Sequence, residues 1–225
     1  MSVIVNFVQG GGYVMYPLLL LSLLAVVVIV ERSLAFRQLG AIPTGLLRET
    51  LSLCRSGSFG DALRLCESSP GPLAACLAVV IKHRSWPTRE IERLVEETGQ
   101  EYFIKLEFLL PVLDTTTTIS PLLGLLGTIV GMIGAFNAIA VQQHRGNSDA
   151  VLAGVGTALY ATATGLTIAV ICFAAYNYFA SRVRTITAET EQGATKLVNL
   201  LTDRRHLDRE VQSHENHRVG RGSEG

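Results

Sequence analysis

The chain has 225 residues, of which 48% are hydrophobic and 17% are charged, and its formal net charge is zero. This composition is typical of a membrane protein with some water-exposed mass and not of a globular enzyme. Neutrality without a basic stripe argues against nucleic acid as a partner.

The first uncharged apolar run, residues 13–30, reads YVMYPLLLLSLLAVVVIV and ends at Glu31 and Arg32. At about 1.5 Å per residue it is long enough to cross a hydrocarbon core of about 30 Å. No Lys or Arg precedes the run and no small-x-small cleavage site follows it. We therefore predict a retained membrane anchor and not a cleaved signal peptide, with residues 1–12 as a short segment on the outer side.

Residues 31–114 are expected to form a helical region. Two short helices are predicted in GSFGDALRLCES and PGPLAACLAVVIKH, which Gly and Pro separate. A longer helix is predicted to begin with Thr88 as its N-cap. Its apolar positions recur every three or four residues: Ile91, Val95, Thr98, Tyr102, Leu106 and Leu109. We expect this helix to continue into the next apolar run as one rod with a kink at Pro111.

Two more uncharged runs give predicted spans at 115–141 and 151–181, and a polar turn at 142–150 joins them into a membrane hairpin. Asp114 and Asp149 are interpreted as helix-terminus residues that complement the helix dipole, in preference to mouths of an ion pathway. Residues 182–206 are predicted to form a cytoplasmic amphipathic helix, and residues 207–225 a disordered tail. No strand signal is present, so the predicted fold is an all-α integral membrane protein with three transmembrane helices and a cytoplasmic helical domain.

The orientation follows from the basic residues. Residues 1–12 contain no Lys or Arg and the hairpin turn contains only Arg145, whereas ten fall between residues 31 and 114 and eight after residue 181. The positive-inside rule places the N-terminus and the turn outside, and the middle segment and C-terminus in the cytoplasm. Three of the four cysteines, Cys54, Cys66 and Cys76, then lie in the reducing cytoplasm, and no CxxC spacing suggests a disulfide framework.

The second span, PLLGLLGTIVGMIGAF, carries small residues on one helix face. Gly124, Gly127, Gly131 and Gly134 are spaced three, four and three residues apart. Close packing of a neighbouring helix explains this spacing by itself, and a smooth pore wall is the alternative. The one hydroxyl among these glycines, Thr128, favours the pore wall.

Hydroxyl groups also mark the third span. Thr157 and Thr164 are seven residues apart and share a face with Tyr160 and Ala161, and Thr162 also lies between them in the sequence. Each threonine can simply bond a carbonyl of its own helix. Together with Thr128, however, they indicate a hydrated or polar-facing surface that comprises Thr128, Thr157, Tyr160, Thr162 and Thr164.

None of the three runs contains Asp, Glu, Lys, Arg or His. A proton pathway through a bilayer normally needs a titratable group, so a partner would have to supply the carboxylate. GVG at 154–156 lacks the third glycine of a dinucleotide loop, and the histidines near the C-terminus are interpreted as tail residues and not metal ligands. We expect no enzymatic activity, no cofactor and no metal.

The segments GGYVMYPLLLLSLLAVVVIVERSLAF, SPLLGLLGTIVGMIGAF, ALYATATGLTIA and YNYF resemble the MotA/TolQ/ExbB proton-channel family, and its ExbB/TolQ branch most closely. The resemblance runs from about residue 10 to about residue 203. It implies a bacterial inner-membrane homopentamer whose second and third spans surround a single-span ExbD/TolR-like partner with a membrane aspartate. Proton passage would then energise a TonB-like or Tol-system protein. Thr128 and Thr162 match the pore-facing threonines of the family.

The sequence departs from the family pattern at two positions. Thr157 stands where ExbB and TolQ proteins often have glutamate, and Ile171 stands where the family has proline. The first departure removes a titratable group from this chain and increases its dependence on the partner's aspartate. A non-conducting membrane scaffold is the competing hypothesis, and an independent solute transporter is disfavoured because no inverted repeat and no charged midplane site are present.

Overall fold

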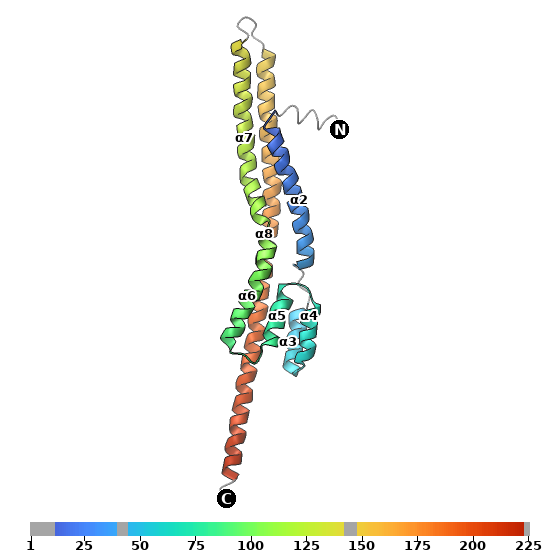
Figure 1. Cartoon of the computed structure of the whole chain (residues 1–225), viewed down its shortest axis with the longest axis vertical. Coiled ribbons are helices and arrows are strands. Elements are labelled where there is room, and N and C mark those ends of the chain that lie inside the picture. Colours follow the sequence, from blue (N-terminus) through green and yellow to red (C-terminus); the bar gives the residue numbers. More distant parts are fainter. Residues whose placement is uncertain (1–11, 40–44, 142–147, 223–225) are drawn as a thin grey trace. The chain divides into compact units, whose positions relative to one another are not determined.

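The computed structural model describes residues 12–39, 45–141 and 148–222, and every regular element within these ranges is an α-helix (Figure 1). The chain divides into two compact units. The first comprises residues up to Ser33 together with Glu107–Ser181, and the second comprises Leu34–Leu106 together with the chain from Arg182. The predicted all-α fold is confirmed.

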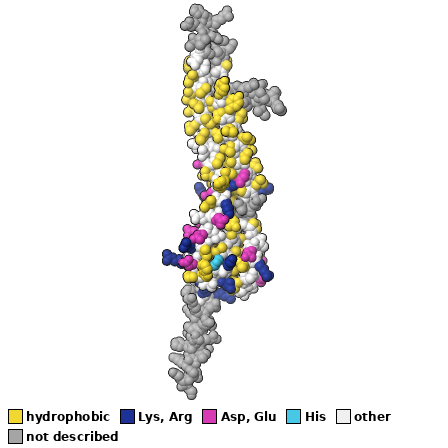
Figure 2. Space-filling view, in the orientation of Figure 1, with side chains coloured by type: hydrophobic (Ala, Val, Ile, Leu, Met, Phe, Trp, Pro, Cys, Tyr) yellow, Lys and Arg dark blue, Asp and Glu magenta, His cyan; other side chains and the backbone are white. Residues whose placement is uncertain are grey.

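The first unit is built from helices α2 (Met15–Leu39), α7 (Leu110–Val141) and α8 (Ser148–Gly222). By length and composition, three helices of the described chain can cross a membrane, as predicted. Figure 2 shows hydrophobic side chains over much of their visible surface. In water such a surface would be a liability, whereas in lipid it is the expected outer face.

The rod predicted to join the long polar helix to the second span is interrupted. Helix α6 spans Thr88–Glu107, a two-residue turn follows at 108–109, and α7 begins at Leu110. Pro111 has no N–H to continue the helical bonds, and its ring conflicts with the carbonyl four residues earlier, that of Glu107. In the first turn of a new helix the missing N–H costs nothing, so Pro111 separates two helices instead of kinking one.

The second unit contains α3 (Leu46–Ser56), α4 (Phe59–Ser68), α5 (Pro72–Lys82), α6 and the continuation of α8. Helices α4 and α5 match the two predicted short helices, whereas α3 was not predicted. Gly57 ends α3 with φ near +86°, where its N–H meets the carbonyl of Cys54. This left-handed conformation favours glycine, and it turns the chain into α4.

Large aliphatic side chains from α5, α6 and α8 form the core of this unit, where Leu77, Ile81, Ile91 and Leu197 are at most 1% exposed. Burying each such side chain stabilises the fold by about 1.5–3 kcal/mol. Thr88 does not act as the predicted N-cap: the Pro87 carbonyl accepts the first helical bond from Ile91, and the Thr88 hydroxyl pairs with that of Thr202.

Helix α8 differs from prediction in its length. It continues from the third span without interruption and reaches Gly222, in place of a separate helix at 182–206 and a disordered tail from 207. Between Gly193 and Gly220 the sequence contains no Gly or Pro, so nothing in it ends the helix. The predicted segment 1–12 lies, apart from Gly12, outside the described residues, as do positions 142–147 of the predicted turn.

Candidate functional site

The hairpin of α7 and α8 brings two rows of small residues together. On α7 these are Gly124, Gly127, Gly131 and Ala135, and on α8 they are Gly154, Ala158, Ala161 and Gly165. A Cβ added to Gly124 would lie 3.0 Å from the Cα of Thr162, and one added to Gly131 would lie 3.0 Å from the carbonyl oxygen of Gly154. We call this contact the α7–α8 seam, and along it the two backbones touch almost directly.

The tightest point of the seam is next to Pro121, the proline inside α7. A Cβ on Gly165 would collide with the backbone carbonyl of Ser120, and one on Gly127 would collide with the Cβ of Ala161. Since a backbone carbonyl cannot move aside like a flexible side chain, only glycine fits at position 165.

Three of the four predicted glycines therefore have a packing role within this chain. Gly124, Gly127 and Gly131 face α8, whereas a Cβ on Gly134 would meet nothing within 4 Å. Their role as a pore wall stays a prediction, and Gly134 is the member with free space beside it. The row of small residues on α8 was not predicted, although its spacing of four, three and four residues is the same kind of signal, and Ala161, predicted on the face of Thr157 and Thr164, lies against α7 in the seam.

Thr162 belongs to the seam. Its hydroxyl donates a hydrogen bond of 3.0 Å to the carbonyl of Gly124, across from α8 to α7. At about 100° of rotation per residue, Thr162 lies about 140° around α8 from Thr157. The structure thus separates Thr162 from the other predicted hydroxyls of this helix.

Those other hydroxyls share a second face of α8, which we call the hydroxyl face: Thr157, Tyr160, Thr164 and Thr167. The threonine hydroxyls donate to carbonyls four residues earlier in their own helix, those of Ala153, Tyr160 and Ala163. Tyr160 is 47% exposed. Each threonine oxygen keeps lone pairs that can accept a bond from water.

Thr128 is the hydroxyl of α7 that the sequence singled out. It is half-buried and donates a 2.7 Å bond to the carbonyl of Leu125 in its own helix. Two other hydroxyls of α7, those of Thr116 and Ser120, are fully buried and bond the carbonyls of Val112 and Thr116. These buried groups are satisfied within the helix and need no water.

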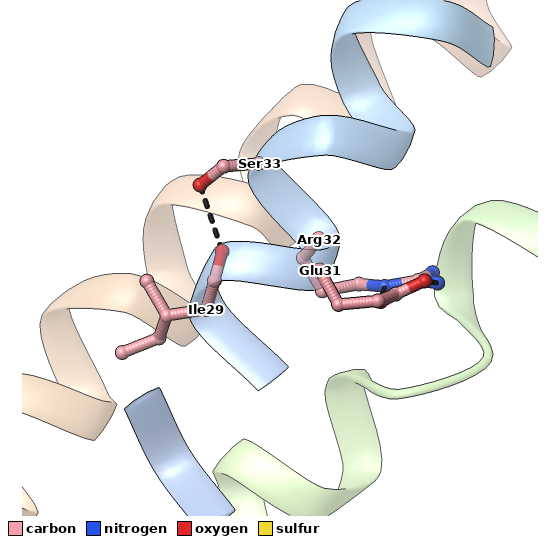
Figure 3. A network of polar contacts seen from close by, with 4 residues as sticks. All are labelled: Ile29, Glu31, Arg32 and Ser33. Carbon is pink, nitrogen blue, oxygen red and sulfur yellow. Dashed lines mark hydrogen bonds and ion pairs between the residues drawn. The ribbon is translucent and has the colours of Figure 1, made fainter. Parts of the chain in front are cut away.

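A charged pair marks the end of the apolar part of α2. The guanidinium of Arg32 contacts the carboxylate of Glu31 through Nε at 2.5 Å and through one terminal nitrogen at 2.6 Å. Figure 3 shows both side chains extending from the same side of the helix, away from the bond between the Ser33 hydroxyl and the Ile29 carbonyl. Arg32 is only 4% exposed, and pairing reduces the cost of burying its charge.

The two spans of the hairpin contain no acidic or basic side chain. From residue 115 to 143 and from 150 to 181 the sequence contains no Asp, Glu, Lys, Arg or His. Within the described residues, no group of three or more His, Cys, Asp or Glu side chains is placed to hold a metal ion. The hairpin can therefore offer backbone packing and neutral hydroxyls, but no carboxylate, imidazole, ammonium or guanidinium group of its own.

Comparison with known proteins agrees with this architecture. Residues 72–192 match the model of the MotA/TolQ/ExbB proton channel family. An ExbB-like protein of Synechocystis is 31% identical over 77% of this chain and 83% of its own length. A biopolymer transport protein of the ExbB type from Vibrio cholerae is 30% identical over 72% of each chain. The Tol-Pal system protein TolQ of Pseudomonas aeruginosa is 41% identical over 35% of this chain and 33% of its own length.

The matched region contains α5, α6, α7 and the part of α8 up to residue 192, which includes both spans of the hairpin. This multi-pass membrane chain belongs to the MotA/TolQ/ExbB proton channel family, in its ExbB/TolQ branch.

Proposed function

We propose that the chain is a proton-channel and motor subunit of an ExbB/TolQ-type inner-membrane complex, which couples the proton-motive force to work on the cell envelope. The observation that carries the proposal is the hydroxyl face of α8. Thr157, Tyr160 and Thr164 line up on a membrane span that contains no Asp, Glu, Lys, Arg or His, beside the seam and not within it.

The hydroxyl face supplies neutral hydrogen-bonding groups. A threonine that donates to its own helix can still accept a bond from water, so a row of them can support a chain of water molecules. A carboxylate must complete such a pathway, because intramembrane proton relays use titratable groups. In this proposal the carboxylate is the membrane aspartate of a single-span ExbD/TolR-like partner enclosed by a homopentamer.

The basic residues supply the proposed orientation. Ten Lys and Arg between residues 31 and 114, with eight more after residue 181, favour a cytoplasmic location for these segments. The N-terminus and the hairpin turn then lie on the periplasmic side. The α2 pair of Glu31 and Arg32 would mark the cytoplasmic edge of the first span.

Energising a TonB-like protein for outer-membrane transport is the preferred role. The ExbB-like relatives from Synechocystis and Vibrio cholerae match about three quarters of this chain, whereas the TolQ relative matches about a third of it. A TolQ-like role in envelope maintenance is the alternative within the family. A membrane scaffold that does not conduct protons is the alternative outside the family's channel role. The packing of Gly124, Gly127 and Gly131 against α8 is what a scaffold would need, but it concerns these glycines only and not the hydroxyl face.

Acid uptake by sealed vesicles tests the proposal. The chain is reconstituted alone, with its single-span partner, and with a partner whose membrane aspartate is replaced by asparagine, and a potassium diffusion potential drives the protons. We expect uptake only with the intact partner. Equal uptake with the asparagine partner, or none from a correctly assembled complex, would contradict proton conduction and favour the scaffold.

A further inference from the structure

The second unit contains a pocket that the proton pathway does not use. It has a volume of about 420 Å³ and lies between one face of α6 and one face of the cytoplasmic part of α8. On α6 its lining runs from Glu92 to Phe103, a length of about 16 Å at 1.5 Å per residue. We call this pocket the α6–α8 groove, and it is about three helical turns long.

Small and apolar residues form the floor of the groove. Gly99 on α6 and Ala194 on α8 line the groove, with the thiol of Cys76 from α5 beside Gly99. The remaining apolar lining comes from Val95, Phe103 and Val198. Two facing helices with an apolar strip between them form the type of groove that accepts the apolar edge of a third helix.

Carboxylates border this apolar strip. Glu92 and Glu96 of α6 and Glu191 of α8 line the groove, all three are exposed, and no Lys, Arg or His is part of the lining. The ion pairs of α6 form elsewhere: Arg93 pairs with Glu97, and Lys105 pairs with Glu101. Among the described residues none of the three groove carboxylates has an ion-pair partner, so the groove presents unneutralised negative charge around an apolar floor.

We infer that the α6–α8 groove docks a basic amphipathic segment, the cytoplasmic flank of the single-span partner. The inference rests on the proposed function for the choice of this partner. The cytoplasmic flanks of membrane spans are enriched in Lys and Arg, which complement the three free carboxylates. An apolar side chain of the same segment would pack against the partly exposed Val95 and Phe103, and the basic residues would pair at the rim. Such docking would hold one end of the partner on the cytoplasmic unit of a subunit.

Site-specific photocross-linking in the full complex tests the inference. Benzoylphenylalanine is placed at Thr195, or at Gln100, both in the groove, and as a control at Ser52, an exposed residue of α3. The chain is co-expressed with its single-span partner, assembly is verified by size-exclusion chromatography, and the cross-linked peptides are identified by mass spectrometry. We expect the partner's basic flank to be captured from Thr195 and Gln100 but not from Ser52.

A matched pair of charge reversals sharpens the test. The double variant Glu92→Lys/Glu96→Lys should lower the cross-linking yield about tenfold, since two attractions become repulsions. The control Glu97→Lys/Glu101→Lys makes the same charge change on the same helix outside the groove and should leave the yield unchanged. Capture of a second copy of this chain, no capture from either groove position, or equal effects of the two double variants would overturn the inference.

The same preparations separate this inference from the proposed function. Aspartate-dependent acid uptake without capture of the partner refutes the docking groove and leaves proton conduction standing. Capture of the partner without acid uptake supports the groove and refutes conduction.

Discussion

The α7–α8 seam and the core of the second unit both pack helices together, but the seam uses the smallest side chains and the core uses large ones. The seam uses glycine and alanine, so that the backbone of Gly165 lies against the carbonyl of Ser120. The core uses large aliphatic side chains such as Leu77 and Ile81, which are essentially unexposed. In lipid, large apolar side chains gain little by leaving the solvent, and close backbone contact with interhelical hydrogen bonds stabilises the pair. In water, the burial of large side chains contributes most of the stability.

This contrast predicts that added volume damages the seam, whereas lost volume damages the core. The most severe change we expect is Gly165→Val. Its side chain has no space beside the Ser120 carbonyl, so the hairpin must open at a cost of about 3 kcal/mol or more. The thermal stability of the purified protein in detergent measures the loss. Gly156→Val is the matched control, because a Cβ there meets nothing within 4 Å and should be tolerated.

The core responds to the opposite change. Leu77→Ala should lower the free energy of unfolding by about 2–5 kcal/mol, because it removes a fully buried side chain and leaves a cavity. Leu122→Ala makes the same substitution on the outer face of α7, where leucine is 60% exposed, and should change stability little. Denaturant unfolding of both variants provides the comparison. Equal losses in the free energy of unfolding for Leu77→Ala and Leu122→Ala would contradict the proposed difference between the core and the outer face of α7.

Hydroxyl deletions should separate the seam from the hydroxyl face. Thr162→Val removes the bond to Gly124 and should cost about 1 kcal/mol of stability. Thr164→Val removes only a bond within α8 and should leave stability nearly unchanged. If the hydroxyl face conducts, however, Thr164→Val should lower proton flux roughly tenfold, equivalent to about 1.4 kcal/mol at the barrier. An unchanged flux in Thr164→Val would count against conduction along this face.

The thiols of the second unit give a smaller effect that depends on pH. Burial raises the pKa of Cys54 and of Cys76 from 9.0 to about 11. At pH 8 the thiolate fraction is then about 100-fold lower than for an ordinary thiol, so both should react slowly with thiol reagents until the unit unfolds. A folded-state pKa above the unfolded one contributes stability that is complete below pH 9 and is lost as pH rises from 9 to 11. Cys76→Ala should flatten this alkaline loss in a series of unfolding measurements, and an unchanged pH profile would contradict it.

Much of this architecture follows from local sequence patterns. Uncharged runs longer than a bilayer give the spans, and the short turn between residues 141 and 151 gives the hairpin. Pro111 was predicted to kink one continuous helix. It separates two helices instead, because a new helix can begin at Leu110, with Pro111 in its first turn. Helix α3 was missed because its polar face and short length make it stable only when it packs against α4.

The candidate site was predicted in part. The glycine spacing of α7 correctly indicated close helix contact, yet a face of small residues does not say which helix fills it. The structure shows that α8 packs against this face through its own row of small residues. This row includes Gly154 and Gly165, which carry no hydroxyl and were not predicted. The partner of Thr162 was likewise hidden, because its bond to Gly124 joins residues 38 positions apart. The groove beside Gly99 could not be predicted, since it depends on how α6 and α8 meet.

Accessibility of single introduced cysteines tests the central claim, that the hairpin has a sealed seam and a separate hydrated hydroxyl face. Thr164→Cys, Ala161→Cys and Leu166→Cys sample the hydroxyl face, the seam and the apolar outer face of the same helix. In membranes containing the complex, a charged water-soluble thiol reagent should modify Thr164→Cys and block acid uptake. The other two variants should stay unmodified. Labelling of Leu166→Cys as fast as Thr164→Cys, or no labelling of Thr164→Cys, would contradict the account.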